Sequence, residues 1–302
     1  MTHLCSYNLY SLDGSKKINI GEKENRICRF CGRSKPDVKF SSKAHAISEF
    51  LGNKQIICLE ECNNCNDFFS SIEQHFFNFQ SVLFPLYGIK GKTGTPKVKG
   101  SDGEIYNENE VVKLKTESRL EEYLTYDSNV PGTLKLEISP FGTFIPQKVY
   151  QCLVKYAISS INTESINQFK ESIDWIRIEK PSLCDLPPVI YFTHDFIEHP
   201  KISVYIRNED NDKCPFALGC LEFADKGFFY IIPLSNSESI TIDKVKSFVF
   251  IFVQLFGKRD FQLLNLSDTN SQKLVFNLNT DNVIPGQTIF EISKDEFDKS
   301  NE

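Results

Sequence analysis

The sequence of 302 residues has one Met and one Trp, no internal repeat, and no apolar run long enough to span a membrane. About 18 consecutive apolar residues are needed to cross a bilayer, and the first residues do not follow a signal-peptide pattern. We therefore expect a cytoplasmic protein that does not enter a membrane. The hydrophobic share of 40% and the charged share of 25% are ordinary for a chain that buries a core.

Acidic residues are missing from positions 74–101, a stretch rich in Gly and Pro that carries Lys90, Lys92, Lys97 and Lys99. This stretch is either a flexible connector or a loop that contacts phosphates, because lysines on a mobile backbone can follow a nucleic-acid strand. Residues 1–100 contain 14 Lys and Arg against 9 Asp and Glu, a net charge of +5, whereas the remainder carries −11. The N-terminal third is therefore predicted to be the part that meets a polyanion such as DNA.

Cysteine is present at ten positions, and four of them form two Cys-x-x-Cys pairs, Cys28/Cys31 and Cys62/Cys65, with 30 residues between the pairs. A two-residue gap lets both sulfurs of one turn face the same ion, so two such pairs predict a tetrahedral four-cysteine zinc site. The alternative is two pairs of buried free thiols. Four other cysteines lack metal-ligand spacing, namely Cys152, Cys184, Cys214 and Cys220. Cys214 and Cys220 lie on a predicted strand and are expected in the core.

Hydrophobic periodicity predicts a mixed α+β chain. A helix is expected to begin at Asn66, with Phe69, Ile72, Phe76 and Phe79 on its buried face, because these residues recur every three or four positions. Further helices are expected from Pro146 and over 163–176, and strands over 9–12, 54–59, 111–115, 133–138, 189–193, 202–207, 217–223, 227–233, 247–252 and 260–266. The chain is thus predicted to consist of a small zinc-stabilised module, residues 1–104, and a mainly antiparallel α+β domain, residues 105–302.

His45 is the only histidine between the two cysteine pairs, 14 positions after Cys31 and 17 before Cys62. It lies in the segment AHAISEFLGN, residues 44–53, and the second pair is followed directly by Asn66. Over roughly residues 20–80, this combination of two Cys-x-x-Cys pairs, an embedded His, Leu-Gly-Asn and a final Asn resembles the HNH nuclease family.

The resemblance implies a ββα-metal fold in which a catalytic divalent ion, Mg²⁺ or Mn²⁺, sits between a strand pair and a helix. It implies that His45 is the general base, since the pKa of histidine lies near neutrality. Asn66 would be a ligand of the ion, and the side-chain amide of Asn53 would orient His45. Glu73 follows Asn66 on one helix face and is a candidate for a carboxylate ligand.

The chain departs from the family pattern just before the histidine, where the family often has an acidic metal ligand and this chain has Ala44. The ion then needs a carboxylate from elsewhere, and Glu49 and Glu61 remain open as alternatives to Glu73. The middle Asn of the family also usually stands nearer the second cysteine pair than Asn53 does.

The sequence therefore predicts a metal-dependent HNH endonuclease that cuts DNA. Its C-terminal domain would regulate, target or dimerise the nuclease, by binding an activating ligand, a partner protein or a second copy of the chain. This arrangement resembles nuclease effectors of bacterial defence against phage. Two alternatives stay open: a catalytically inactive zinc-ribbon module that binds nucleic acid, which Ala44 would explain, and a nuclease that cleaves RNA.

Overall fold

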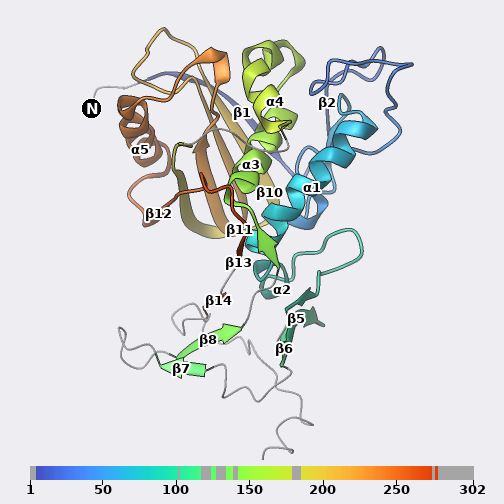
Figure 1. Ribbon diagram of the computed structural model, residues 1–302, viewed down its shortest axis with the longest axis vertical. Coiled ribbons are helices and arrows are strands. Elements are labelled where there is room, and N and C mark those ends of the chain that lie inside the picture. Colours follow the sequence, from blue (N-terminus) through green and yellow to red (C-terminus); the bar gives the residue numbers. More distant parts are fainter. Residues whose placement is uncertain are drawn as a thin grey trace, which may run out of the picture. The chain divides into compact units, whose positions relative to one another are not determined.

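The computed structural model (Figure 1) describes residues 5–100, 103–116, 124–126, 134–138, 142–178, 185–273 and 276–277. The chain divides into two compact units, each made of two separate stretches of sequence. Unit 1 comprises Met1–His75 and Ile145–Asn270, and unit 2 comprises Phe76–Phe144 and Ser271–Glu302. These boundaries fall elsewhere than the predicted division after residue 104, because the segment after residue 144 belongs to the same unit as the cysteine pairs.

Unit 1 is built around an antiparallel sheet of four strands in the order β1, β10 and β11, with β12 also pairing with β10. The bounds of these strands are Tyr7–Asp13, Val189–Arg207, Ala217–Ile231 and Phe261–Leu264. The predicted strands 189–193 and 202–207 are parts of the single long strand β10, and 217–223 and 227–233 are largely covered by β11. The N-terminal strand β1 pairs with the far end of β10, with Tyr7 opposite Arg207.

Helices cover both faces of this sheet. Successive side chains of a strand point to opposite faces, so neighbouring residues of β11 contact different helices. Phe229 and Ile231 on β11 pack with Phe248 and Phe252 of α5, Ile242–Phe256. Tyr230 stands between Phe229 and Ile231 in the sequence, and its hydroxyl donates to the carbonyl oxygen of Leu153 in α3 at 2.6 Å. Helix α3 spans Pro146–Ser160, and it is followed by the 3₁₀ segment η3, Thr163–Phe169, and α4, Lys170–Ile176.

The predicted strand 247–252 is wrong, because these residues belong to helix α5. The run Phe248-Val249-Phe250-Ile251-Phe252 consists of β-branched and aromatic residues, which favour strands by propensity. The contacts at the two ends of the segment favour a helix instead of a strand. The Thr241 hydroxyl accepts a hydrogen bond from the Lys244 backbone N–H at 3.3 Å, and Gly257 ends the helix.

The remaining elements of unit 1 surround the cysteine pairs. Strand β2, Ile18–Ile20, pairs in parallel with β3, Ile56–Cys58, and the 3₁₀ turn η1 spans Glu49–Leu51. Gly52 ends η1 in a left-handed conformation, with φ of 86°, which glycine adopts without steric cost. Helix α1 spans Asn63–Gln80, so it begins three residues before the predicted start.

Unit 2 contains the end of α1, a short helix α2, and small sheets. Antiparallel sheets are formed by β4, β5 and β6, by β7, β8 and β14, and by β9 and β13. Their bounds are Leu83–Leu86 for α2, then Val98–Lys99, Gly103–Glu108, Val111–Thr116, Leu124–Tyr126, Leu134–Ile138, Thr143–Phe144, Gln272–Lys273 and Phe276–Asn277 for β4 to β9, β13 and β14.

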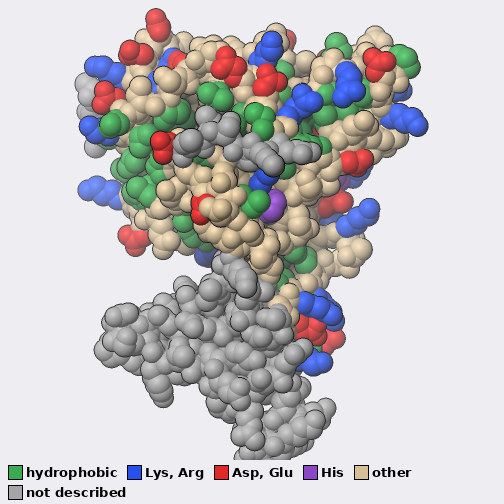
Figure 2. Space-filling view, viewed as in Figure 1, with side chains coloured by type: hydrophobic (Ala, Val, Ile, Leu, Met, Phe, Trp, Pro, Cys, Tyr) green, Lys and Arg blue, Asp and Glu red, His purple; other side chains and the backbone are tan. Residues whose placement is uncertain are grey.

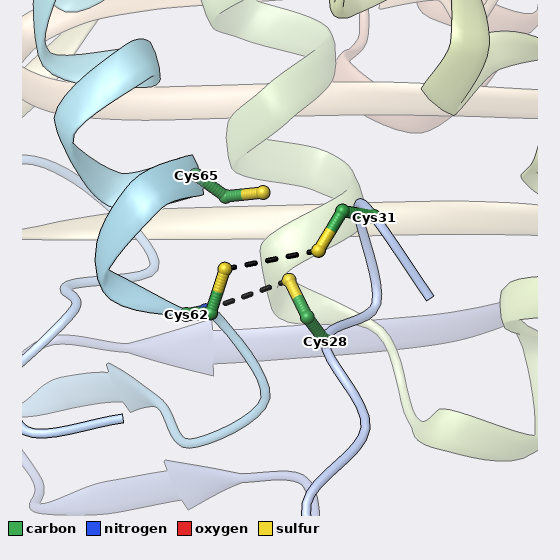
Figure 3. Close-up of side chains that lie close together, drawn as sticks. All are labelled: Cys28, Cys31, Cys62 and Cys65. Atoms are coloured by element: carbon green, nitrogen blue, oxygen red, sulfur yellow. Dashed lines mark hydrogen bonds between the residues drawn. The ribbon is translucent and has the colours of Figure 1, made fainter. Parts of the chain in front are cut away.

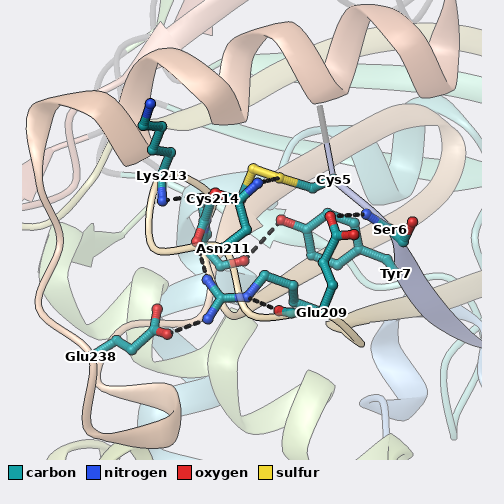
Figure 4. Close-up of a disulfide and its surroundings, with 10 residues drawn as sticks. Cys5, Ser6, Tyr7, Glu209, Asn211, Lys213, Cys214 and Glu238 are labelled. Carbon is teal, nitrogen blue, oxygen red and sulfur yellow. Dashed lines mark hydrogen bonds and ion pairs between the residues drawn. A yellow bond between two sulfur atoms is a disulfide. The ribbon is translucent and has the colours of Figure 1, made fainter. Parts of the chain in front are cut away.

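Cys5 and Cys214 form a disulfide that joins the residue two positions before β1 to the loop between β10 and β11 (Figure 4). Beside it, the Tyr7 hydroxyl donates to the Pro215 carbonyl at 2.8 Å, and the Arg207 guanidinium donates to the Cys214 carbonyl at 2.5 Å. Cys214 and Cys220 are buried as predicted, and Cys152 is buried as well. The sequence does not predict the disulfide of Cys214. Cys184 lies outside the described residues.

The structure confirms a mixed α+β chain whose sheets are mainly antiparallel. In the part of the chain that the structure describes, none of the helices combines the length and apolar character needed to cross a membrane.

Candidate functional site

The two cysteine pairs converge, as Figure 3 shows, where the loop at residues 28–31 meets the start of α1. The four sulfur atoms of Cys28, Cys31, Cys62 and Cys65 all lie within 4.8 Å of one another. Cys31 Sγ and Cys62 Sγ are 3.8 Å apart. Four thiolates at about 2.3 Å from a central ion form a tetrahedron with edges of about 3.8 Å. The cluster is therefore close enough, and suitably shaped, to bind a metal ion.

The surroundings of the cluster favour a thiolate. Hydrogen bonds from the Cys65 thiol and from backbone N–H groups hold the pKa of Cys28 at about 4, against the opposing effect of burial. The bond to Cys28 raises the pKa of Cys65 far above its ordinary value. Burial raises the pKa of Cys62 to about 11. A bound cation would compensate the negative charges that the four thiols would otherwise have to hold close together.

A buried ion pair fixes the first cysteine loop to Glu60, in the segment just before the second cysteine pair. Arg29 Nη2 lies 2.9 Å from Glu60 Oε2, with the two side chains 1% and 5% exposed. Arg29 also donates to the carbonyl oxygens of Ile158 and Ile161 at 2.8 and 3.0 Å. The Thr163 hydroxyl donates to Glu60 at 3.0 Å. The cysteine cluster is thus tied to the end of α3, more than 120 residues further along the chain.

His45 lies on a short extended segment that runs antiparallel to β3. His45 is paired with Ile57, and the backbone N–H groups of Ala46 and Cys58 donate to Ile56 and Ala44 at 3.1 and 2.9 Å. The segment and β3 thus form a two-stranded ladder, which leads through the second cysteine pair into α1.

The His45 ring is largely buried, with its side chain 10% exposed. Nε2 lies 3.3 Å from Glu49 Oε1, and Nδ1 has no hydrogen-bond partner among the described residues. Burial lowers the pKa of His45, although the Glu49 carboxylate raises it in part. The lowered pKa favours the neutral imidazole, which is the form that accepts a proton.

Asn53 is completely buried, and its amide forms hydrogen bonds with the backbone rather than with the His45 ring. Its Nδ2 donates to the carbonyl oxygens of Ile47 and Ile56 at 2.6 and 3.0 Å, and its Oδ1 accepts from Gln55 and Ile56 N–H groups at 3.1 and 2.9 Å. Asn53 therefore holds together the loop between the His45 segment and β3. It positions His45 through the main chain, not by the predicted contact with the imidazole.

Glu73 and Asn66 both lie on α1, and they differ in their contacts. Glu73 Oε1 is 2.9 Å from Lys155 Nζ of α3, and Glu73 Oε2 accepts a hydrogen bond from the Ser48 hydroxyl. Asn66 is half-buried, and its backbone N–H donates to the Cys62 carbonyl at 2.9 Å in the first turn of the helix.

The contacts of Glu73 bear on whether the predicted catalytic divalent ion fits beside His45. Among the described residues, the four cysteines are the only group of three or more His, Cys, Asp or Glu side chains close enough for one ion. Both oxygens of Glu73 already have partners, one of them an ammonium group. The carboxylate predicted as a ligand of Mg²⁺ or Mn²⁺ is therefore engaged by Lys155 and Ser48.

Lys155 is the centre of a buried charged cluster that the sequence analysis missed. Its side chain is 2% exposed, and Nζ lies 3.2 Å from the His45 carbonyl oxygen and 3.5 Å from Glu61 Oε2. Burial by itself lowers the pKa of Lys155, but Glu61 and Glu73 outweigh it and raise this pKa above its ordinary value. Burial raises the pKa of Glu61 to about 7, although Lys155 lowers it in part.

The only signal of this cluster in the sequence is that Lys155 interrupts the largely apolar run at residues 152–158 of this helix. Helix α3 is buried on all sides, including Val154, Lys155 and Tyr156. A lysine in such a helix requires an acidic partner, because an unpaired buried charge is strongly unfavourable. Periodicity does not identify that partner.

The lysines of the predicted phosphate-contacting loop, all exposed, lie in unit 2: Lys90, Lys92, Lys97 and Lys99. Lys97 Nζ is 4.6 Å from the centre of the Tyr106 ring, and Lys99 Nζ is 3.5 Å from Glu104. Part of the loop is strand β4, so the stretch is not wholly irregular. On the face shown in Figure 2, basic and acidic side chains are interspersed. Nucleic-acid contact by these lysines stays a prediction.

A scan against protein-family models found no match, and searches of curated proteins and of solved structures found none either. The resemblance to the HNH family therefore rests on the motif residues alone.

Proposed function

We propose that unit 1 carries an HNH-type nuclease site, stabilised by a zinc ion on the four cysteines, that hydrolyses phosphodiester bonds of DNA. Tetrahedral thiolates suit zinc better than harder cations, which supports the choice of ion. The observation that carries the proposed activity is His45. Its buried Nδ1 has no hydrogen-bond partner among the residues that the structure describes, and His45 lies on a short strand pair that is followed by the second cysteine pair and α1.

In the proposed reaction, His45 accepts a proton from water while the water oxygen attacks phosphorus. The bond between phosphorus and the 3′ oxygen breaks, and that oxygen takes a proton from solvent. Glu49 lies against Nε2 and stabilises the imidazolium that forms. No step is assigned to a second ion, because Glu73, the carboxylate predicted to bind it, is engaged by Lys155 and Ser48.

We expect His45→Ala to lower the rate of nicking of supercoiled plasmid by about 100-fold or more, since a positioned general base contributes about 10²–10⁴. The assay should compare wild type and variant on DNA and on RNA, with and without added Mg²⁺ or Mn²⁺. His199→Ala, on β10, is the matched control and should retain wild-type activity. Nicking that persists in His45→Ala would contradict the catalytic role of His45.

The titration of His45 gives a second test, which does not depend on activity. We expect the wild-type imidazole to titrate below its ordinary pKa of about 6.5 because it is buried. Glu49→Gln should lower the pKa further, because the Glu49 carboxylate stabilises the protonated ring. NMR titration of the histidine ring protons measures both values, with His45→Ala identifying the signal. An increase in the pKa in Glu49→Gln would show that the two side chains do not interact as described.

A nucleic-acid-binding module without nuclease activity is the second candidate function. The Lys155–Glu73 ion pair favours it, because it engages the carboxylate that a catalytic ion would need. Tight binding of DNA or RNA without cleavage under any metal condition would support this candidate over the nuclease.

A further inference from the structure

The Lys155 ammonium lies between the two elements that the HNH resemblance would join through a divalent ion. It contacts the His45 carbonyl oxygen at 3.2 Å on the strand side and Glu73 Oε1 at 2.9 Å on the helix side. Glu61 Oε2 is 3.5 Å away, just before the start of α1. Three oxygens from three segments thus surround one cation that comes from α3.

We infer that Lys155 is the built-in cation of the His45 site, and that it keeps a divalent ion from binding between His45 and Glu73. A divalent ion at this place would have to share the Glu73 carboxylate with an ammonium 2.9 Å away, and like charges repel strongly in a buried environment. Displacement of the Lys155 ammonium group is also unfavourable, because it would leave Glu61 and Glu73 buried without a positive charge.

The hydroxyl network around Glu73 supports the same assignment. Ser48 donates to Glu73 Oε2, and the Tyr156 hydroxyl in turn donates to Ser48 Oγ at 2.8 Å. Tyr156 and Lys155 are neighbours on α3, so one helix supplies both the charge and the hydroxyl that fix this carboxylate. These contacts therefore hold the Lys155 ammonium group at this position.

Lys155 would act through its neighbours, since its side chain is almost fully buried and does not reach solvent. It fixes the main chain of His45 against α1, and so it is a positioning residue. Only the effect of Lys155 on cleavage rests on the proposed function. Exclusion of a divalent ion is a property of the cluster itself and is measurable without any activity.

The test is Mn²⁺ binding to the full zinc-loaded chain, followed by the loss of the electron paramagnetic resonance signal of free Mn²⁺. Wild type and Lys155→Arg, which keeps the charge, should bind no Mn²⁺ at this site. Lys155→Met keeps the length of the side chain but removes its charge, and it should gain one Mn²⁺ site per chain. The double variant Lys155→Met/Glu73→Gln should lose that site again. A merely structural lysine would not produce this gain and loss.

Two results would overturn the inference. One is Mn²⁺ binding by the wild type that Glu73→Gln abolishes, and this measurement does not need a variant of Lys155. The other is a folded Lys155→Met that binds no Mn²⁺. If Lys155→Met folds only when Mn²⁺ is added, that dependence supports the inference.

Plasmid nicking separates this inference from the proposed function. If both hold, wild type nicks plasmid at the same rate with and without Mg²⁺ in buffer freed of divalent ions by chelating resin. If the wild type does not nick DNA or RNA, the nuclease proposal fails and the Mn²⁺ measurement still decides the role of Lys155.

Discussion

Replacing Cys62 by serine should reduce the zinc content from about one ion per chain to near zero and unfold the region around the cysteine cluster. Cys62 directly precedes α1, and its backbone N–H lies 3.5 Å from Cys28 Sγ, so it joins the two halves of the site. Structural zinc contributes an apparent free energy of about 10–16 kcal/mol in small zinc-binding peptides. Here the surrounding unit supplies additional packing, so we expect a large loss of stability confined first to the cysteine loops.

Metal analysis, thermal denaturation and hydrogen exchange would measure these effects. Protection from exchange should fall in the backbone around Cys28, Cys62 and the first turn of α1, while the long strand β10 should remain protected. Cys58→Ala is the matched control, because Cys58 is equally buried but lies outside the cluster. Its zinc content should stay at wild-type level. A Cys62→Ser protein with full zinc content and unchanged melting would contradict the metal site.

Arg29→Met should reduce the free energy of unfolding by about 3–5 kcal/mol, the range measured when one partner of a buried ion pair is removed. Glu60 would keep its charge in a site that is 5% exposed. The carbonyl oxygens of Ile158 and Ile161 would lose their donor as well. Loss of these contacts would weaken the attachment between the first cysteine loop and α3.

Urea denaturation at neutral pH would measure this change, and a double-mutant cycle would separate the ion pair from the other contacts. Arg29→Met/Glu60→Gln should be less destabilised than the sum of the two single variants, because the uncompensated carboxylate is gone. Lys201→Met is the control. Lys201 pairs with Glu222, and the Lys201 side chain is 45% exposed, so that solvent screens the pair and it contributes only about 0–1 kcal/mol. A similar loss in Lys201→Met and Arg29→Met would disprove the special role of the buried pair.

Local patterns in the sequence predict the cysteine cluster and helix α1, because both depend on residues close together in the chain. A Cys-x-x-Cys spacing is set by a single turn, and the apolar stripe of α1 is set by the helical period. Helix α5 shows where such patterns fail. Its apolar run is short and rich in β-branched and aromatic residues, so propensity favours a strand, and only the Thr241 cap and the packing against β11 decide for a helix.

The contacts around His45 could not be predicted in the same way. Lys155 reaches the His45 carbonyl from 110 positions further along the sequence, and nothing near either residue indicates the pairing. Asn53 was correctly placed in the loop after His45, but its contacts depend on the fold of that loop. The helical period predicts that Asn66 and Glu73 share a face of α1, but it does not predict the Lys155 ammonium group that contacts Glu73 from α3. The roles of Asn66 and Glu73 as ion ligands stay predictions.

The pairing of β1 with β10 constrains the order in which the protein can fold during its synthesis. Tyr7 lies opposite Arg207, so β1 has no partner until about 200 further residues have been made. At about 5–20 residues per second, this delay lasts roughly 10–40 s. The cysteine ligands are complete at residue 65, long before that time. A nascent chain therefore carries all four cysteines of the cluster while β1 is still unpaired, and that strand is open to pairing with other chains until β10 emerges.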